Sequence, residues 1–231
     1  MIEVVGLDGD DTLWHNEQLF VDTQDRYREL LRPHVDLPDA DLDQRLLATE
    51  RRNLPLFGYG VKAFTLSLLE TAIELTDGRI PGRDLQMVLD LGRALLDHPV
   101  QLLDGVVEAV DALTDRYRVM LLTKGDLLHQ ETKVARSGLD EVLWRVEVMS
   151  EKDEATYRRV LDRNRVDPTR FVMVGNSVRS DVLPVLAIGG RAVHIPYHVT
   201  WALEEVDPHP AHDYPVLDSI ADLPAYLDGL P

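Results

Sequence analysis

The sequence predicts an α/β protein: a parallel β-sheet with helices on both faces, and an α-helical segment inserted after the first strand. Two observations carry this prediction. Short apolar segments of strand length alternate with segments of helical periodicity over most of the chain, which is typical of a parallel sheet covered by helices. The stretch from residue 15 to residue 98 breaks the alternation, because it shows helical patterns and no convincing strand.

The expected strands are short apolar runs. The first is Val4–Leu7, whose length suits a buried strand. Five further segments have the same character, at residues 118–123, 143–150, 171–175, 191–195 and 214–217. Helical patterns separate most of them, for example at residues 106–115, 153–163 and 181–188.

The insert contains four groups of apolar residues at helical spacing. They are Leu19, Phe20, Tyr27, Leu30 and Leu31; Leu42, Leu46 and Leu47; Phe64, Leu68, Ala72 and Leu75; and Leu85, Val88, Leu89, Leu95 and Leu96. Proline and glycine interrupt the pattern at Pro33, Pro38, residues 55–60 and residues 77–82. We therefore expect a core domain of residues 1–14 and 99–231 and a four-helix cap domain of residues 15–98.

The composition limits the possible partners and compartments. The 231 residues are 45% hydrophobic and 28% charged, and the formal net charge is −17. This excess of acids disfavours nucleic acid and anionic membranes as partners. Cysteine is absent, which excludes disulfides, thiolate zinc sites and cysteine nucleophiles. The sequence has no signal-peptide pattern and no apolar run near the roughly 20 residues that span a bilayer, so we expect a cytoplasmic protein. Nothing in the sequence indicates an oligomeric state.

The first strand leads directly into Asp8-Gly9-Asp10-Asp11-Thr12. Ligands of open α/β sheets bind at the carboxyl ends of the strands. Carboxylates crowded there repel one another unless a cation or a shared proton relieves them. The segment therefore predicts a hard cation on oxygen ligands, with one carboxylate acting as nucleophile or acid/base. An EF-hand loop is excluded, because its required Gly and Glu positions hold Leu13 and Leu19.

Three further segments place polar residues at or just after expected strands. Thr123 ends one strand, Lys152 follows the next, and a glycine turn leads through Asn176 to Asp181. In this order, and together with the first motif, they resemble the haloacid dehalogenase superfamily, specifically its Mg²⁺-dependent phosphatase branch. The resemblance covers nearly the whole chain. It implies a Rossmann-like core, and the helical insert resembles the first type of cap domain in this superfamily.

The resemblance implies roles for four acid and amide side chains. Asp8 would attack phosphorus and form an aspartyl-phosphate, while Asp10 would protonate the leaving oxygen and then activate water. Mg²⁺ would be bound by the Asp8 carboxylate and the Asp10 backbone carbonyl, with Asn176 and Asp181 completing the site. Asn176 departs from the family pattern, which has an acid at this position, so the site carries one negative charge fewer. Asp181 alternatively caps the helix that follows it.

The resemblance also implies phosphate-binding residues. Thr123 would donate a hydrogen bond to a phosphoryl oxygen. Lys152 would neutralise the phosphoryl charge and keep Asp8 ionised. Many relatives have Asn after the threonine, whereas this chain has Lys124, which either contacts phosphate or points to water.

Several other residues are weaker candidates. Arg51, Arg52 and Lys62 flank the interrupted stretch of the insert and could contact an anionic substrate, although a solvated helix end explains them as well. Trp14 either lines the site or packs in the core. A second metal site is conceivable from the spacing of the histidines, but a proline-rich surface loop is the preferred interpretation of His194, His198, His209 and His212.

We expect the protein to be a phosphatase that uses Mg²⁺ to hydrolyse a small phosphorylated metabolite, with the cap closing over the substrate. The nearest enzymatic rival is a 2-haloacid dehalogenase, in which Asp8 displaces halide from carbon without Mg²⁺. Relatives with that activity generally lack an acid two residues after the nucleophile, so Asp10 argues against it. A sugar phosphomutase and a catalytically idle ligand-binding protein are also compatible with the motifs, and Asn176 is the feature that favours the idle protein.

Overall fold

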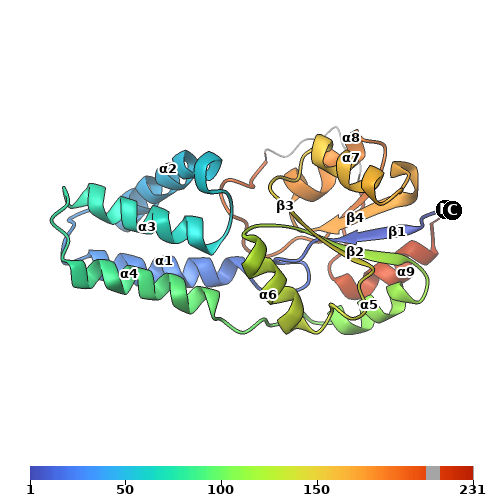
Figure 1. Cartoon of the computed structure of the whole chain (residues 1–231), viewed down its shortest axis with the longest axis horizontal. Coiled ribbons are helices and arrows are strands. Elements are labelled where there is room, and N and C mark those ends of the chain that lie inside the picture. The colour runs from blue at the N-terminus through green and yellow to red at the C-terminus, as the bar shows by residue number, and fades with distance from the viewer. Residues whose placement is uncertain (207–213, 231) are drawn as a thin grey trace. The chain divides into compact units, whose positions relative to one another are not determined.

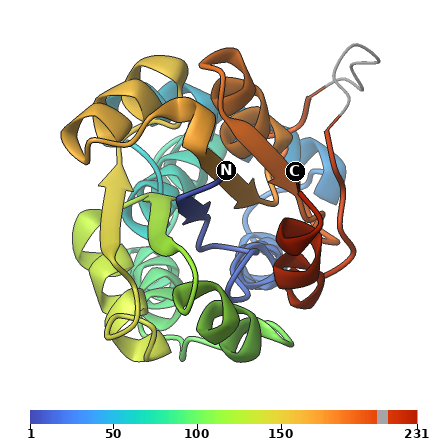
Figure 2. The same ribbon diagram turned by 90° about the vertical axis from the view of Figure 1, so that its right-hand side faces the viewer.

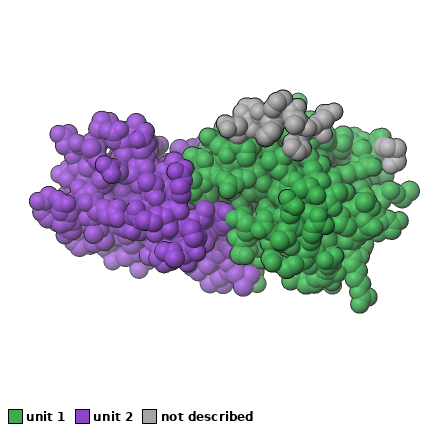
Figure 3. Space-filling model, turned by 90° about the horizontal axis from the view of Figure 1, so that it is seen from above, with its two compact units in different colours: residues 1–17, 100–124, 130–231 green, residues 18–99, 125–129 purple. Residues whose placement is uncertain are grey.

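The structure is a computed structural model that describes residues 1–206 and 214–230. The chain divides into two compact units, coloured separately in Figure 3. Unit 1 comprises residues 1–17, 100–124 and 130–231, and unit 2 comprises residues 18–99 and 125–129. The short segment 125–129 groups with unit 2 although it follows a strand of unit 1, which no local pattern in the sequence indicates.

Unit 1 contains a five-stranded sheet in which every strand pair is parallel (Figure 1). In spatial order the strands are β3 (Arg145–Met149), β2 (Arg118–Lys124), β1 (Val4–Leu7), β4 (Phe171–Gly175) and β5 (Arg191–His194). Leu7 at the end of β1 is in register with Leu121 and Val174 of its neighbours. The residues that follow β1, β2 and β4 therefore emerge at the same edge of the sheet.

Helices cover both faces of this sheet, as Figure 2 shows. Side chains alternate between the faces along each strand, so Val5 and Leu7 of β1 pack into one layer and Val4 packs into the other. The first layer is formed by α5 (Val106–Thr114), α6 (Leu127–Ser137) and α9 (Leu223–Asp228). The second is formed by α7 (Glu154–Arg163) and α8 (Leu183–Ala187). Burial on both faces explains why the strands are apolar throughout.

Unit 2 consists mainly of four helices, as expected for the insert. They are α1 (Glu17–Leu31), α2 (Asp39–Phe57), α3 (Val61–Leu75) and α4 (Gly82–Leu96). Their apolar stripes form one core, in which Tyr27 and Leu68 are fully buried. The Tyr27 hydroxyl donates to the Leu68 carbonyl at 2.7 Å, which satisfies the polar end of a buried aromatic ring. In the described ranges no helix has the length and apolarity needed to cross a bilayer.

The expected strand at residues 214–217 is wrong. Val216 makes only an isolated bridge with His194 of β5. Pro215 accepts a hydrogen bond from the backbone of His194 at 2.9 Å, but it has no N–H to return one. The ladder therefore does not extend, and the sheet has five strands instead of the expected six.

The helix expected at residues 181–188 begins earlier than the sequence indicates. A π-helical turn, Val178–Val182, precedes α8. Its cap is Ser177, whose hydroxyl accepts from the backbone N–H of Ser180 at 3.1 Å. Asp181 consequently lies inside the turn and is not the capping residue.

Candidate active site

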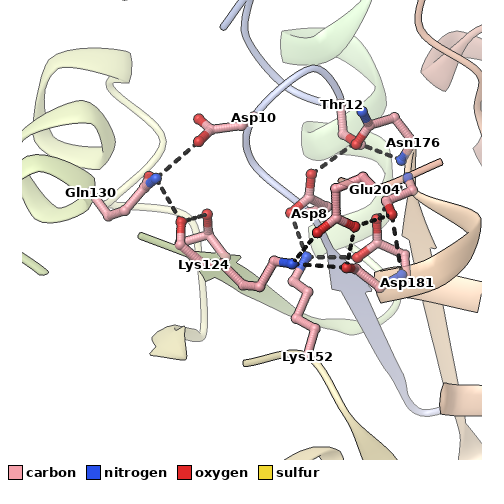
Figure 4. Close-up of polar contacts among 12 residues, drawn as sticks. Asp8, Asp10, Thr12, Lys124, Gln130, Lys152, Asn176, Asp181 and Glu204 are labelled. Carbon is pink, nitrogen blue, oxygen red and sulfur yellow. Dashed lines mark hydrogen bonds and ion pairs between the residues drawn. The ribbon is translucent and has the colours of Figure 1, made fainter. Parts of the chain in front are cut away.

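Asp8 is the first residue after β1 and is buried, with 7% of its surface exposed. Its backbone N–H donates to the Val174 carbonyl of β4 at 2.9 Å, which holds it at the edge of the sheet. Thr12 Oγ1 donates to Asp8 Oδ2 at 3.2 Å and accepts from the backbone N–H of Asn176 at 3.1 Å. Thr12 therefore ties the loop after β1 to the loop after β4 (Figure 4).

Lys152 lies between the carboxylates of Asp8 and Asp181 (Figure 4). Its Nζ pairs with Asp8 Oδ1 and lies 2.6 Å from Asp181 Oδ1. Burial alone would lower the pKa of Lys152, but the charges of Asp181 and Asp8 raise it, so the ammonium stays charged. Burial raises the pKa of Asp8 to about 7; Lys152 opposes this rise and Asp181 adds to it. One lysine between two carboxylates leaves a negative excess that a further cation would relieve.

Asp181 reaches this position because Gly175 has no side chain. A Cβ on Gly175 would overlap the carboxylate of Asp181. The π-helical turn also offers Asp181 a backbone donor, since the N–H of Ser177 lies 3.1 Å from Asp181 Oδ2. Both carboxylate oxygens thus have partners, Lys152 on one and Ser177 on the other.

The side chain of Asn176 meets two oxygens of the first motif. One terminal atom of its amide lies 3.2 Å from Asp8 Oδ2 and 3.2 Å from the backbone oxygen of Asp10. With nitrogen at this position, the amide donates to both oxygens. With oxygen there, three oxygens converge, and the Thr12 hydroxyl lies 3.4 Å from the Asn176 oxygen as its donor.

The second arrangement fits a hard cation. Mg²⁺ binds oxygens at about 2.0–2.1 Å in octahedral geometry, so adjacent ligands lie about 3 Å apart. That spacing is close to both distances at Asn176. The set contributes a single carboxylate, and within residues 1–206 and 214–230 no cluster of three or more His, Cys, Asp or Glu residues could hold a metal. The oxygens of Asp8, Asp10 and Asn176 are thus the candidate ligands.

The Asp10 carboxylate points away from Asp8 and toward α6 (Figure 4). Three donors hold it there: Trp14 Nε1 at 2.6 Å, Gln130 Nε2 at 2.9 Å, and the ammonium of Lys133. Burial would raise the pKa of Asp10, but the charge of Lys133 and these hydrogen bonds lower it below its usual value. Asp10 is therefore ionised in this conformation.

Asp11, for which the sequence suggests no task, closes the turn that leads into α1. Its φ of 62° lies in the left-handed region, which Asp tolerates better than most residues. Its carboxylate accepts hydrogen bonds from the backbone N–H groups of Asn16 at 2.8 Å and Glu17 at 3.0 Å. These N–H groups lie at the start of α1, where the helix itself offers them no acceptor. Burial and the charge of Asp10 raise the pKa of Asp11 to about 7, against these two donors.

Lys124, the last residue of β2, forms an ion pair with Glu204 at 2.6 Å. It also lies 2.9 Å from Ser180 Oγ and 3.5 Å from Glu151. Glu204 is a site residue that the sequence analysis missed. No local motif marks it, because its partner is 80 residues away along the chain.

Thr123 and Trp14 are both buried. Thr123 is 1% exposed and donates to the Lys124 carbonyl at 3.4 Å, at the end of β2. Trp14 is fully buried in the core of unit 1. Its ring fits because Gly9 has no side chain, since a Cβ there would lie 2.7 Å from it. Trp14 therefore packs in the core and also donates to Asp10 from there.

The three basic candidates in the insert belong to unit 2, whereas Asp8 and its partners belong to unit 1. Arg52 pairs with Glu70 at 2.7 Å and with Glu74 at 2.8 Å. Lys62 pairs with Asp126 at 2.9 Å, and Arg51 is exposed. A role of Arg51, Arg52 and Lys62 in substrate specificity stays a prediction.

Two of the four histidines considered as a second metal site can be placed. His194 Nε2 lies 3.0 Å from the Asn176 carbonyl, and His198 packs against Tyr197 with ring centroids 4.2 Å apart. His209 and His212 lie outside the described residues.

Comparisons with known proteins identify the family and the fold. A sequence model described as "Hydrolase: haloacid dehalogenase-like hydrolase" matches residues 2–189. The crystal structure of a haloacid dehalogenase-like family hydrolase from Xanthomonas campestris is 46% identical, with a TM-score of 0.87 over 98% of this chain and 91% of that one. Comparison with curated proteins gave no match.

Two more distant structures share the fold. A 2-haloacid dehalogenase from Pseudomonas syringae pv. Tomato is 23% identical, with a TM-score of 0.66 over 99% of both chains. A predicted phosphoglycolate phosphatase from Haemophilus somnus is 15% identical, with a TM-score of 0.63 over 98% of both chains. At these identities the likeness establishes the architecture and not the reaction. The family model and the Xanthomonas relative go further: this chain belongs to the haloacid dehalogenase-like hydrolase family.

Proposed function

We propose that this hydrolase uses Mg²⁺ to hydrolyse a small phosphomonoester through an aspartyl-phosphate on Asp8. The observation that carries the proposal is the convergence of the Asp8 carboxylate, the Asp10 backbone carbonyl and the Asn176 amide beside the buried ammonium of Lys152. This arrangement supplies a nucleophilic carboxylate, a place for a divalent cation and a fixed positive charge at one edge of the sheet. Phosphoryl transfer depends mainly on such positioning and charge.

The first step forms a bond between a carboxylate oxygen of Asp8 and phosphorus and breaks the bond to the leaving oxygen. Asp10 supplies the proton that this oxygen needs. Because Asp10 is ionised and directed toward Gln130 and Lys133, acting as the acid requires it to gain a proton and rotate toward the leaving oxygen.

In the second step Asp10 accepts a proton from water, and the water oxygen attacks phosphorus of the aspartyl-phosphate. The bond from phosphorus to Asp8 breaks, which restores the carboxylate and releases inorganic phosphate. Lys152 stabilises charge on the phosphoryl group, and Thr123 offers a hydroxyl donor. Mg²⁺ held by Asp8, Asp10 and Asn176 would supply Lewis-acid stabilisation of the same charge.

A 2-haloacid dehalogenase is the second candidate. It is favoured by the donor orientation of Asn176, in which the amide satisfies Asp8 and Asp10 without a cation. In this reaction Asp8 would displace halide from carbon. Asp10 argues against it, because this chemistry has no use for an acid that protonates an oxygen leaving group.

A panel of phosphorylated metabolites, assayed for phosphate release with Mg²⁺ and with EDTA, tests the proposal. We expect turnover by the wild type in Mg²⁺ only, and background activity from Asp8→Asn. Full activity of Asp8→Asn would exclude the mechanism. Chloride release from a 2-halo acid in EDTA would favour the dehalogenase, and isomerised substrate without free phosphate would indicate a phosphomutase.

A further inference from the structure

Residues 196–206, which follow β5, carry Glu204 to the edge of the sheet where Asp8 lies. Two residues of this segment besides Glu204 contact other parts of unit 1. The Tyr197 hydroxyl lies 2.7 Å from His15 Nδ1, and Arg179 Nη1 donates to the Leu203 carbonyl at 2.6 Å. The segment therefore runs close to the site with Glu204 near its far end.

The Glu204 carboxylate is surrounded by donors. Lys124 Nζ lies 2.6 Å from Oε1, and the hydroxyls of Ser177 and Ser180 donate to Oε2 at 2.7 and 2.5 Å. Burial would raise the pKa of Glu204, but Lys124 and the two serines lower it, so the group is ionised. The Lys124 and Glu204 side chains are only 13% and 14% exposed, so water screens the pair weakly.

These donors lie at the end of β2 and in the segment that follows β4, next to residues of the site. Lys124 directly follows Thr123, Ser177 caps the π-helical turn that contains Asp181, and Ser180 lies within that turn. A carboxylate in this place meets a cation and two hydroxyl donors, which are the groups that also bind the oxygens of a phosphate. Glu204 thus occupies a ready-made anion site next to the nucleophile.

The lysines near Asp8 are already paired with carboxylates, so the pairing of Lys124 with Glu204 affects how a phosphate would bind. Lys152 contacts Asp8 and Asp181, Lys133 contacts Asp10, and Lys124 contacts Glu204. Each of these lysines is matched by at least one carboxylate before any substrate arrives. A phosphate dianion entering beside Asp8 adds negative charge and gains from any lysine that is released to it.

We propose that Glu204 holds Lys124 in the resting protein and must yield this lysine to the substrate phosphate, so that Glu204 limits phosphate affinity. This inference rests on the proposed phosphatase function and adds a residue that controls its substrate binding. Glu204 is neither nucleophile nor acid; it is an internal competitor for one phosphate-binding cation.

The test compares inhibition by inorganic phosphate in wild type, Glu204→Gln and Glu205→Gln, with Mg²⁺ present and p-nitrophenyl phosphate as substrate. Gln keeps the shape and accepts from the serines, but it removes the charge that competes for Lys124. We expect Ki for phosphate and KM to fall about threefold or more in Glu204→Gln. Glu205 is the exposed neighbour in the sequence, and Glu205→Gln should leave Ki unchanged. An equal or higher Ki in Glu204→Gln overturns the inference, because it means that Glu204 supports Lys124 instead of competing with the ligand.

A second measurement needs no change at Glu204. Trp201 lies three residues before it in the same segment, so phosphate with Mg²⁺ should change tryptophan fluorescence in the wild type and not in Trp201→Phe. If the fluorescence does not change, the segment that carries Glu204 does not move when phosphate binds, and this result overturns the release of Lys124 by Glu204. If the wild type neither hydrolyses phosphomonoesters nor binds phosphate, the proposed function fails. If it turns over normally and Glu204→Gln does not lower Ki, this inference alone fails.

Discussion

Lys133 of α6 forms an ion pair with Oδ1 of Asp10 across 123 positions of the chain. The Asp10 carboxylate that it contacts points away from Asp8 and toward Gln130 of the same helix (Figure 4). With Gln130 and Trp14 it determines where the predicted acid/base rests and that it rests ionised. The resting position of Asp10 therefore depends on α6 as well as on the loop that contains it.

We expect Lys133→Met to destabilise the protein more than removal of both charges does, because it leaves the Asp10 charge buried without its partner. The side chains are 10% and 23% exposed, so the pair is mostly shielded from solvent. A double-mutant cycle with Asp10→Asn, measured by urea unfolding at pH 7, should give a coupling free energy of about 1–3 kcal/mol. Effects that add within about 0.5 kcal/mol would show that the pair is not coupled.

Gly175→Ala should lower both stability and activity, because it displaces the Asp181 side chain. The added methyl group would overlap the Asp181 carboxylate and push it away from Lys152. We expect a loss of about 1–3 kcal/mol in the free energy of unfolding, together with a lower kcat. Gly82→Ala is the matched control, because no atom lies within 4 Å of a Cβ there. Equal free energies of unfolding for the two variants would contradict the prediction, because they would mean that displacing Asp181 does not destabilise the fold.

The elements that carry the site could be predicted because their signals are local. The apolar run before Asp8 and the glycine turn before Asp181 mark strand ends in the sequence itself, and parallel strands bring those ends to one edge. Residues 214–217 show the limit of this reasoning. They are as apolar as a strand, but Pro215 prevents them from continuing the ladder.

Glu204, Gln130 and Lys133 could not be found in this way. Each contacts the site from a segment whose own pattern is that of an ordinary loop or amphipathic helix. Gln130 and Asp10 are 120 positions apart, and Glu204 and Lys124 are 80 apart. Partners of this kind depend on the packing of whole elements, which the local sequence does not encode.

Asn176→Asp should make the protein depend more on Mg²⁺ for stability. A carboxylate cannot donate to Asp8 Oδ2 or to the Asp10 carbonyl, and it adds a like charge 3.2 Å from Asp8. We expect a lower Tm than wild type in EDTA and a larger rise in Tm when Mg²⁺ is added, since the ligand stabilises the folded state that binds it.

Asn176→Ala separates the two parts of this argument, because it removes the donor without adding charge. Its Tm in EDTA should also fall, but its rise with Mg²⁺ should be smaller than that of the wild type. A rise in Asn176→Asp no greater than in the wild type would contradict the assignment of Asn176 as a metal ligand.

Asp11→Asn should change how stability depends on pH. Burial and the charge of Asp10 raise the pKa of Asp11 to about 7, so the folded state keeps a proton on Asp11 up to that pH while the unfolded chain loses it near pH 4. The contribution of Asp11 to the free energy of unfolding therefore falls as the pH rises from about 4 to about 7. Asn keeps an acceptor for the N–H groups of Asn16 and Glu17 and cannot ionise. The stability of Asp11→Asn relative to wild type should then increase between pH 5 and pH 8 by about 1 kcal/mol or more in urea unfolding, whereas Asp104→Asn, at an exposed acid, should show no such increase. Parallel pH profiles for wild type and Asp11→Asn would mean that Asp11 is already ionised at pH 5.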